Sequence, residues 1–336
     1  MIHNDKMVVK SAANDIMKLS IIIPTYNRVK DLDECLDSII IQTTLPREMI
    51  IVDDSVNDEV KNLIAKRKNE FEGKCIFLKY IRNEKEKSAS VARNIGIKYA
   101  IGDIILFLDS DVILDTNYIK AILKVFEENP HAMGVQGLIQ NIKTCKKLKY
   151  LYFLFNRLFY LGFDEKDRCR VLPSLYSTYP CSLNKNINCE WLSGSNQSYR
   201  RSVLQEFKFD ENLKKYSYGE DLDISYRVFK KYPHTLFMAP YAKLLHKESP
   251  EGRHLKREVI YTEVIYLTYL FYKNMGQNFK NKLIFIWSRI GRMIVNAKSL
   301  ISKPEIKYVI KAPFYCLQHL EEIKKGDLQF FNRTLR

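Results

Sequence analysis

Two carboxylates separated by one residue end an apolar run in the first third of the chain. Asp109 and Asp111 follow the segment IILFL, with Ser110 between them. Carboxylate oxygens at this spacing can bind a divalent cation such as Mg²⁺ or Mn²⁺, together with the diphosphate of a ligand. An isolated Asp-x-Asp is weak evidence, since aspartate is common in turns.

Two more polar clusters follow apolar runs nearer the start of the chain. The run SIII is followed by Pro24-Thr25-Tyr26, and the run IIV by Asp53-Asp54. The alternation of such β-branched runs with helical periodicity predicts a βαβαβ arrangement around a parallel sheet. Because ligands of such sheets bind at the carboxyl ends of the strands, the three polar clusters are expected to converge on one site. The intervening helices are expected at about 30–41, 57–70 and 89–100.

The remainder of the chain mixes helices with short strands. Residues 144–163 predict an amphipathic, aromatic-rich helix, which packs on the protein or lies on its surface. A polar, loop-like stretch follows to about Asn188. Further elements are expected at about 200–206 (helix), from Glu220 (helix), at 235–239 (strand) and from 251 to the end (helices).

Five blocks of sequence resemble a known family when they are taken together. In chain order they are SIIIPTYNR, IIVDDS, VARNIGI with the following LFLDSDV, WLSGSNQSYRRSVL and GEDLDISYR. Over about residues 19–250 they are similar to family 2 inverting glycosyltransferases. The resemblance implies the GT-A fold, a Rossmann-like α/β nucleotide-diphospho-sugar transferase fold with a mostly parallel central sheet flanked by helices. We expect this domain at 18–250, a flexible leader at 1–17 and a basic, aromatic-rich helical extension at 251–336.

The resemblance implies a nucleotide pocket and a metal site at the strand ends. Asp54 would hydrogen-bond the base, typically uracil, and Arg93 would lie near the nucleotide and its phosphates. Asp109 would lie near the ribose, and Asp111 would bind Mg²⁺ or Mn²⁺. The remaining residues implied to line the nucleotide pocket are Pro24, Thr25 and Tyr26.

The resemblance also implies an acceptor side and a general base. Asp221 would be the base, with Glu220 beside it on the acceptor side. His246 would complete the metal site or touch phosphate. The residues implied to face the sugar and the acceptor are Trp191, Gly194, Ser195 and Asn196.

Several of these residues also fit simpler structural roles. Glu220 and Asp221 begin a helix, where acidic residues are favoured by the helix dipole alone. Arg93 fits a solvated helix position, and His246 an ordinary surface histidine. Asp223 and Arg227 are four residues apart, so we expect an ion pair within the helix.

The implied activity is a single inverting displacement. A sugar would move from a nucleotide diphosphate donor, UDP-linked, to an acceptor hydroxyl of a saccharide or a lipid-linked acceptor, in cell-surface polysaccharide or glycolipid synthesis. Such a reaction needs a carboxylate that accepts the acceptor proton and a cation that stabilises the departing diphosphate. A sugar-1-phosphate nucleotidyltransferase would instead need a glycine-rich loop after the first strand, and PTYNR is not such a loop. A non-enzymatic lipid-binding or nucleic-acid-binding module is the remaining alternative, but acidic strand ends would repel nucleic acid unless a metal intervened.

The basic charge of the chain is concentrated near its end. The formal net charge is +15, and residues 243–336 carry 18 Lys and Arg against 8 Asp and Glu. The seven scattered cysteines suggest neither a disulfide framework nor a zinc site, so we expect a cytoplasmic protein. The extension is expected to lie on an anionic membrane surface with its aromatic residues at headgroup level, or else to pack on the catalytic domain. The aromatic residues considered for this contact are Tyr261, Tyr266, Tyr269, Phe271, Tyr272, Phe285 and Trp287.

Overall fold

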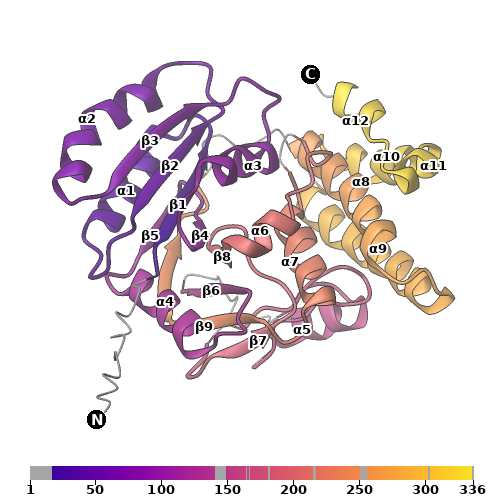
Figure 1. Cartoon of the computed structure of the whole chain (residues 1–336). Coiled ribbons are helices and arrows are strands. Elements are labelled where there is room, and N and C mark those ends of the chain that lie inside the picture. Colours follow the sequence, from indigo (N-terminus) through magenta and orange to yellow (C-terminus); the bar gives the residue numbers. More distant parts are fainter. Residues whose placement is uncertain are drawn as a thin grey trace, which may run out of the picture.

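Four parallel strands form one half of a nine-stranded sheet, in the order β3-β2-β1-β4 (Figure 1). The inner strands β1, β2 and β4 are rich in isoleucine, valine and leucine and are almost entirely buried, as expected for strands covered on both faces, whereas β3 at the edge is mostly half-buried. The strands are β1 (Leu19–Thr25), β2 (Glu48–Asp53), β3 (Phe77–Arg82) and β4 (Ile104–Phe107). The computed structural model describes residues 17–140, 149–163, 165, 167–180, 182–214, 217–249, 256–301 and 303–334. Residues 1–16 of the expected leader lie outside this range.

Helices cover the two faces of the parallel half, and β1 shows how one strand contributes to both. Ile21 and Ile23 pack in the core under the helices α1 and α2, whereas Ile22 points to the opposite core beside α3. At Gly96 of α3, a Cβ atom would lie 2.4 Å from the side chain of Ile22, so only glycine lets this helix approach the strand so closely. The expected helices are confirmed as α1 (Val29–Ile40), α2 (Glu59–Gly73) and α3 (Ala89–Tyr99).

The other half of the sheet is mixed, and its short strands were not predicted. β8 continues the sheet antiparallel to β4, and β6, β9 and β5 follow. The predicted strand at 235–239 is the start of β9, which is longer because it pairs successively with β7, β6 and β5. The strands are β5 (Val112–Leu114), β6 (Gly134–Ile139), β7 (Ile187–Cys189), β8 (Gln197–Arg200) and β9 (Leu236–His246). The helices beside them are α4 (Tyr118–Glu128), α6 (Arg201–Glu206) and α7 (Glu220–Lys231).

The predicted amphipathic helix at 144–163 is α5, which spans Lys149–Leu158. The segment 141–148 lies outside the described residues. The ring of Phe159, just beyond α5, stacks on Trp287 of the C-terminal extension at 4.7 Å between ring centroids. α5 therefore packs against the extension.

The C-terminal extension packs against the sheet domain through a third core. This core joins Leu175, Leu213 and Leu222 to the inner faces of the last helices. Several aromatic residues considered for a membrane surface belong to it: Tyr266, Tyr269, Phe271 and Phe285 are buried. That prediction is corrected for these residues, because their rings fill the contact between extension and domain. The helices are α8 (Lys256–Asn274), α9 (Phe279–Leu300), α10 (Ile306–Gln318), α11 (Leu320–Lys325) and α12 (Gln329–Thr334).

The expected boundary near 250 falls on residues 250–255, outside the described part of the chain. Among the described residues, none of the helices combines the length and the apolar character needed to cross a membrane.

Candidate active site

A cavity of about 640 Å³ opens at the carboxyl ends of β1, β2 and β4. Its opposite wall is formed by the start of α7, the turn at 193–195 and residues of α8. The three polar clusters that follow the strands therefore meet at one place, as the topology requires. Their residues in the cavity wall are Pro24, Thr25, Tyr26, Asp54, Asp109, Ser110 and Asp111.

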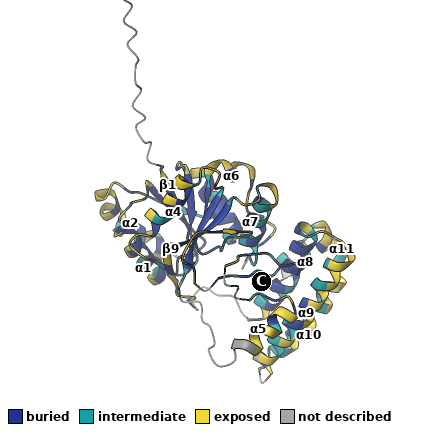
Figure 2. Ribbon diagram, turned by 90° about the horizontal axis from the view of Figure 1, so that it is seen from below, coloured by how far each residue is buried: buried dark blue, intermediate teal, exposed yellow. Residues whose placement is uncertain are grey.

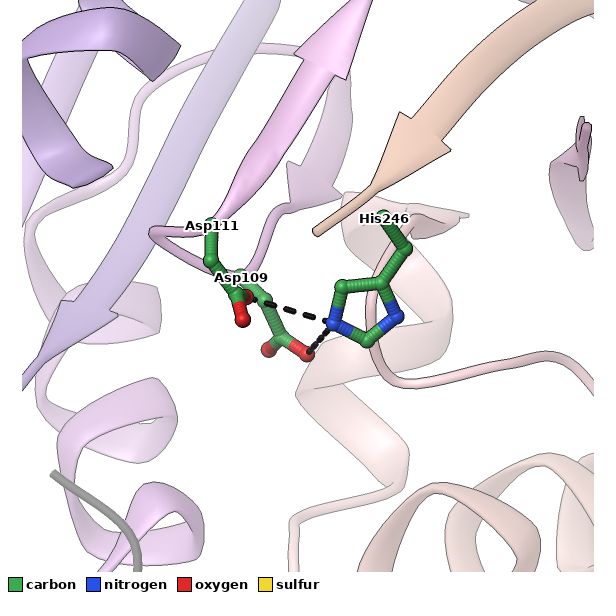
Figure 3. A group of neighbouring side chains, drawn as sticks. All are labelled: Asp109, Asp111 and His246. Carbon is green, nitrogen blue, oxygen red and sulfur yellow. Dashed lines mark ion pairs between the residues drawn. The ribbon is translucent and has the colours of Figure 1, made fainter. Parts of the chain in front are cut away.

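Asp109, Asp111 and His246 form a group of side chains that can hold a metal ion. One ligand atom of each lies within 4.8 Å of the others. Nε2 of His246 is 3.2 Å from Oδ1 of Asp111 and 3.9 Å from Oδ2 of Asp109 (Figure 3). His246 reaches this position because β9 runs antiparallel to β5, which places it opposite Val112. His246 is therefore half-buried within this group, and its role as a metal ligand stays a prediction.

The surroundings of Asp111 favour its charged form. Its Oδ2 lies 3.1 Å from Nη1 of Arg28 and accepts a hydrogen bond from the Ser249 amide at 3.0 Å. Burial opposes ionisation, but His246, Arg28 and this amide together hold the pKa of Asp111 below its usual range. Oδ1 is buried and faces His246. Two carboxylates and an imidazole are a donor set suited to a divalent ion such as Mn²⁺, so the residues present fit a metal.

Arg93 is buried at the centre of the acidic cluster, which overturns the alternative of a solvated helix residue. Its Nη1 donates to Oε1 of Glu220 at 2.6 Å, and its Nη2 reaches Oδ1 of Asp109 at 3.2 Å. Nη2 also lies 3.3 Å from the carbonyl oxygen of Gly194. One guanidinium therefore ties α3, the end of β4, the 193–195 turn and α7 together. Among the acidic side chains it contacts Asp109 and Glu220 directly, and its role near the nucleotide and its phosphates stays a prediction.

Glu220 and Asp221 begin α7 immediately after Gly219, whose φ of 84° lies in the left-handed region that favours glycine. Burial raises the pKa of Glu220 to about 8. The negative charge of the neighbouring Asp221 also raises this pKa, whereas the positive charge of Arg93 lowers it. Burial also raises the pKa of Asp221, against hydrogen bonds from the amides of Gly194 and Leu222. Both residues line the cavity. A carboxyl group with a raised pKa is better matched to accepting a proton near neutral pH.

Some residues of the turn at 193–196 line the cavity, and another is buried in the protein interior. Gly194 and Ser195 line the cavity. Asn196 is fully buried, and its Oδ1 accepts from the Gly137 amide at 2.7 Å and lies 3.2 Å from the hydroxyl of Tyr118. The structure therefore corrects the expectation that Asn196 faces the sugar. The side-chain oxygen of Asn196 instead links the turn to β6 and α4 by hydrogen bonds.

Asp54 lies at the β2 end of the cavity and is held from two sides. Its carboxylate accepts from Nδ2 of Asn83 at 2.6 Å and from the Ser88 amide at 3.1 Å. Burial raises the pKa of Asp54 to about 6, although these two hydrogen bonds act in the opposite direction. Tyr26 lies nearby, with the ammonium of Lys87 4.8 Å from its ring centroid. An aromatic ring and a buried carboxylate side by side can bind a nucleobase.

Trp191 lies in the wall of the cavity beside the 193–195 turn. Its indole Nε1 donates to the carbonyl oxygen of Thr178 at 3.0 Å, and its ring packs against Tyr179. The orientation of the indole is therefore fixed by the segment that precedes β7.

The predicted ion pair between Asp223 and Arg227 on α7 is confirmed at 2.8 Å.

A family model described as glycosyl transferase family 2 matches residues 20–207, which is more than half of the chain. The chain belongs to glycosyl transferase family 2. The predicted family is thus confirmed, and the mostly parallel sheet with flanking helices is that of the GT-A fold.

Curated relatives agree with this membership, and a solved structure shares the fold. An uncharacterized glycosyltransferase of Rickettsia conorii is 40% identical over 212 residues, covering 63% of this chain and 30% of the relative. The glucosyl-dolichyl phosphate glucuronosyltransferase of Haloferax volcanii is 23% identical over 240 residues, covering 69% of both chains. The structure of S. aureus TarS 1–349 in complex with UDP-GlcNAc matches with a TM-score of 0.56 and 19% identity, covering 93% of this chain and 89% of that one. The chain spans less than a third of the length of the rickettsial relative.

Several cavity residues of this family 2 chain were missed in the sequence. Arg28 ends the PTYNR block, so its position could have been noticed there. Tyr176 and Glu258 reach the cavity from a loop and from α8, and no local pattern marks them. Lys87 follows Glu86 in a charged stretch that has the appearance of a solvated loop.

Proposed function

We propose that this chain is a metal-dependent inverting glycosyltransferase that moves a sugar from a UDP-linked donor to an acceptor hydroxyl. The observation that carries the proposal is one cavity that joins the group of Asp109, Asp111 and His246 to the carboxylate of Asp221. Arg93 links the two parts through Asp109 and Glu220. A donor diphosphate and an acceptor hydroxyl can thus be bound in the same space.

The nucleotide would lie at the β1 and β2 ends of the cavity. Asp54 would accept a hydrogen bond from the N–H of uracil, and Tyr26 would contact the base. Pro24 and Thr25 would complete this wall, and Asp109 would lie beside the ribose. TarS 1–349, which was solved with UDP-GlcNAc, shares the fold and supports a nucleotide-sugar donor.

Asp111 and His246 would hold Mg²⁺ or Mn²⁺, with Asp109 alongside. The bound cation supplies charge neutralisation for the departing diphosphate. The imidazole favours Mn²⁺, because nitrogen ligands suit transition ions better than Mg²⁺. Arg28 lies close to Asp111 and is placed to contact the same phosphates once they are bound.

Asp221 would accept the proton of the acceptor hydroxyl. As the acceptor oxygen forms its bond to the anomeric carbon, the bond from that carbon to the diphosphate oxygen breaks, which inverts the configuration. The amides of Gly194 and Leu222 hold the carboxylate at 2.7 and 2.8 Å. Each carboxylate oxygen keeps a further lone pair for the acceptor hydroxyl. Glu220 would keep Arg93 in place, and the indole of Trp191 would contact the sugar or the acceptor with Ser195.

The acceptor would be a saccharide or a lipid-linked molecule of cell-surface polysaccharide or glycolipid synthesis. The glucuronosyltransferase of Haloferax volcanii, named for a glucosyl-dolichyl phosphate, supports the lipid-linked class. Tyr176 and Tyr218 lie on this side of the cavity and offer aromatic surfaces to a sugar ring.

The proposal is tested by incubating the full chain with a panel of UDP-, GDP- and TDP-sugars and measuring release of the free nucleotide. We expect release from one UDP-sugar with Mn²⁺ or Mg²⁺ and none in EDTA. Release that is equally fast in EDTA, or no release from any sugar nucleotide with or without a saccharide acceptor, would contradict the proposal.

A further inference from the structure

The helix α9 carries a row of large apolar side chains on its outer face. Leu283, Ile286 and Ile290 are 50, 57 and 44% exposed, although such residues are usually buried. The row recurs every three or four positions, so its members share one face of the helix. The complete row is Phe279, Leu283, Ile286, Ile290 and Ile294, with Trp287 at its edge.

A second exposed apolar row continues this surface on α5. Leu151, Leu154 and Leu158 are spaced for one face of that helix and are 66, 40 and 60% exposed. The two helices are joined directly, because Nε1 of Trp287 donates to the carbonyl oxygen of Leu158 at 2.9 Å. Figure 2 shows α5 and α9 together at one end of the molecule, away from α2. We call the two rows the α5–α9 surface.

The charged side chains of α9, which borders this surface, are all positive. Lys280, Lys282 and Lys298 are exposed on the helix. The sequence contains no Asp or Glu between Glu263 and Glu305. An apolar face bordered by lysines is typical of a helix that lies in the headgroup region of an anionic membrane. At about 1.5 Å per residue, the 22 residues of α9 give a contact roughly 33 Å long.

The opposite face of α9 reaches the candidate active site. The guanidinium of Arg289 lies 4.6 Å from the ring centroid of Tyr176, which lines the cavity. Arg292 pairs with the buried carboxylate of Glu263, which also accepts from the hydroxyl of Tyr176 at 3.1 Å. The cavity wall and the α5–α9 surface are therefore separated by the thickness of one helix.

We propose that the α5–α9 surface docks this protein on an anionic lipid bilayer. A second copy of the chain is a poorer partner, because a symmetric contact would bring the lysines of two α9 helices together. The docked helix holds the acceptor side of the cavity close to the lipid headgroups. This last step rests on the proposed function, since it presents a lipid-linked acceptor to the site.

The test is flotation of the full chain with vesicles of phosphatidylcholine containing one quarter phosphatidylglycerol, and with pure phosphatidylcholine. The apolar variant is Leu283→Ser with Ile286→Ser and Ile290→Ser, and the charge variant is Lys280→Gln with Lys282→Gln. The control variant is Ile41→Ser with Phe77→Ser, because these residues are 60 and 56% exposed but lie on the first half of the sheet domain. All substituted side chains are exposed, and thermal melts verify that each variant is folded.

We expect the wild type and the control variant to float with the anionic vesicles and to remain at the bottom with neutral ones. The apolar variant should lose at least about tenfold in partitioning, and the charge variant about fivefold for each cation removed. Wild-type protein that does not float, or an apolar variant that floats like the wild type, would overturn the proposal. It would also be overturned if sedimentation without vesicles showed a dimer that the apolar variant converts to a monomer. Because the assay contains no sugar nucleotide, its result is independent of whether the chain transfers sugar.

Discussion

The backbone amide of Gly194 donates a hydrogen bond to Oδ2 of Asp221 at 2.7 Å. The second oxygen of the same carboxylate accepts from the Leu222 amide at 2.8 Å. Two fixed donors leave the carboxylate little rotational freedom, so the direction in which it can accept a proton is set by the backbone. The proposed base is therefore oriented before any substrate binds.

Gly194→Ala should disturb this orientation. A Cβ atom at this position would lie 3.2 Å from both Cβ and Oδ2 of Asp221, so the carboxylate must shift by a few tenths of an ångström. We expect sugar transfer to fall by about tenfold or more, because small displacements of reacting groups are costly, while UDP affinity stays within about twofold. Steady-state kinetics and calorimetry measure the two quantities. Gly73→Ala is the control, since nothing lies within 4 Å of its Cβ, and equal activity of the two variants would refute the prediction.

Glu220→Gln should change how the stability of the metal-free protein depends on pH. The pKa of Glu220 is raised to about 8 by burial, against about 4.3 in an unfolded chain. The folded state therefore keeps a proton that the unfolded state loses, and this contribution to stability is lost as the pH rises toward about 8. Glutamine has no such proton, so its melting temperature relative to wild type should rise by at least about 2 °C between about pH 5 and about pH 9. If the difference in melting temperature between variant and wild type is the same at every pH in this range, the raised pKa is disproved.

Uridine binding should weaken as the pH falls through the pKa of Asp54, which burial raises to about 6. The carboxylate accepts a hydrogen bond from the base, whereas the protonated form is a poorer acceptor. Between about pH 7 and about pH 5 we expect the dissociation constant to rise by about tenfold. Uridine carries no phosphate, so its titration followed by NMR does not involve the metal site. The variant Asp54→Ala should bind weakly at every pH, and pH-independent binding by the wild type would refute the role of Asp54.

His246→Ala should weaken Mn²⁺ binding in the presence of UDP by about tenfold or more, because one of three protein ligands is lost. Electron paramagnetic resonance of free Mn²⁺ measures this affinity without any turnover. His131→Ala is a matched control, since His131 is exposed and lies against Phe237, away from the cavity. If both variants bind Mn²⁺ as the wild type does, His246 is not a ligand.

The strands and helices of the sheet domain could be predicted wherever a short stretch of sequence carries the pattern. Runs such as SIII and IILFL are buried strands whose ends are polar, and parallel pairing then brings Asp54 and Asp109 to the same edge. His246 is different, since its place beside Asp111 depends on β9 pairing with β5 more than a hundred residues away. No periodicity within either segment contains that information.

The extension shows a second limit of sequence reasoning. Helical spacing makes Tyr266 and Phe271 as suitable for a membrane as Phe279 and Ile286, because all are aromatic or apolar residues on basic helices. Tyr266 and Phe271 are buried because they share a core with Leu213 and Leu222, whereas Phe279 and Ile286 lie outside that core and are exposed. Asn196 is a similar case, because its burial depends on Tyr118 and Gly137 from two other elements.

Asp221→Asn tests the central claim most directly, once a donor and an acceptor are known. Asparagine keeps the size of the side chain and one acceptor oxygen for the Gly194 amide, but it cannot take the acceptor proton. We expect the rate of sugar transfer to fall by about 10²-fold or more, while the affinity for UDP and Mn²⁺ is unchanged. Glu220→Gln is the companion variant and should retain more activity than Asp221→Asn. Normal transfer by Asp221→Asn, together with loss of transfer in Glu220→Gln, would contradict the account and assign the proton to Glu220.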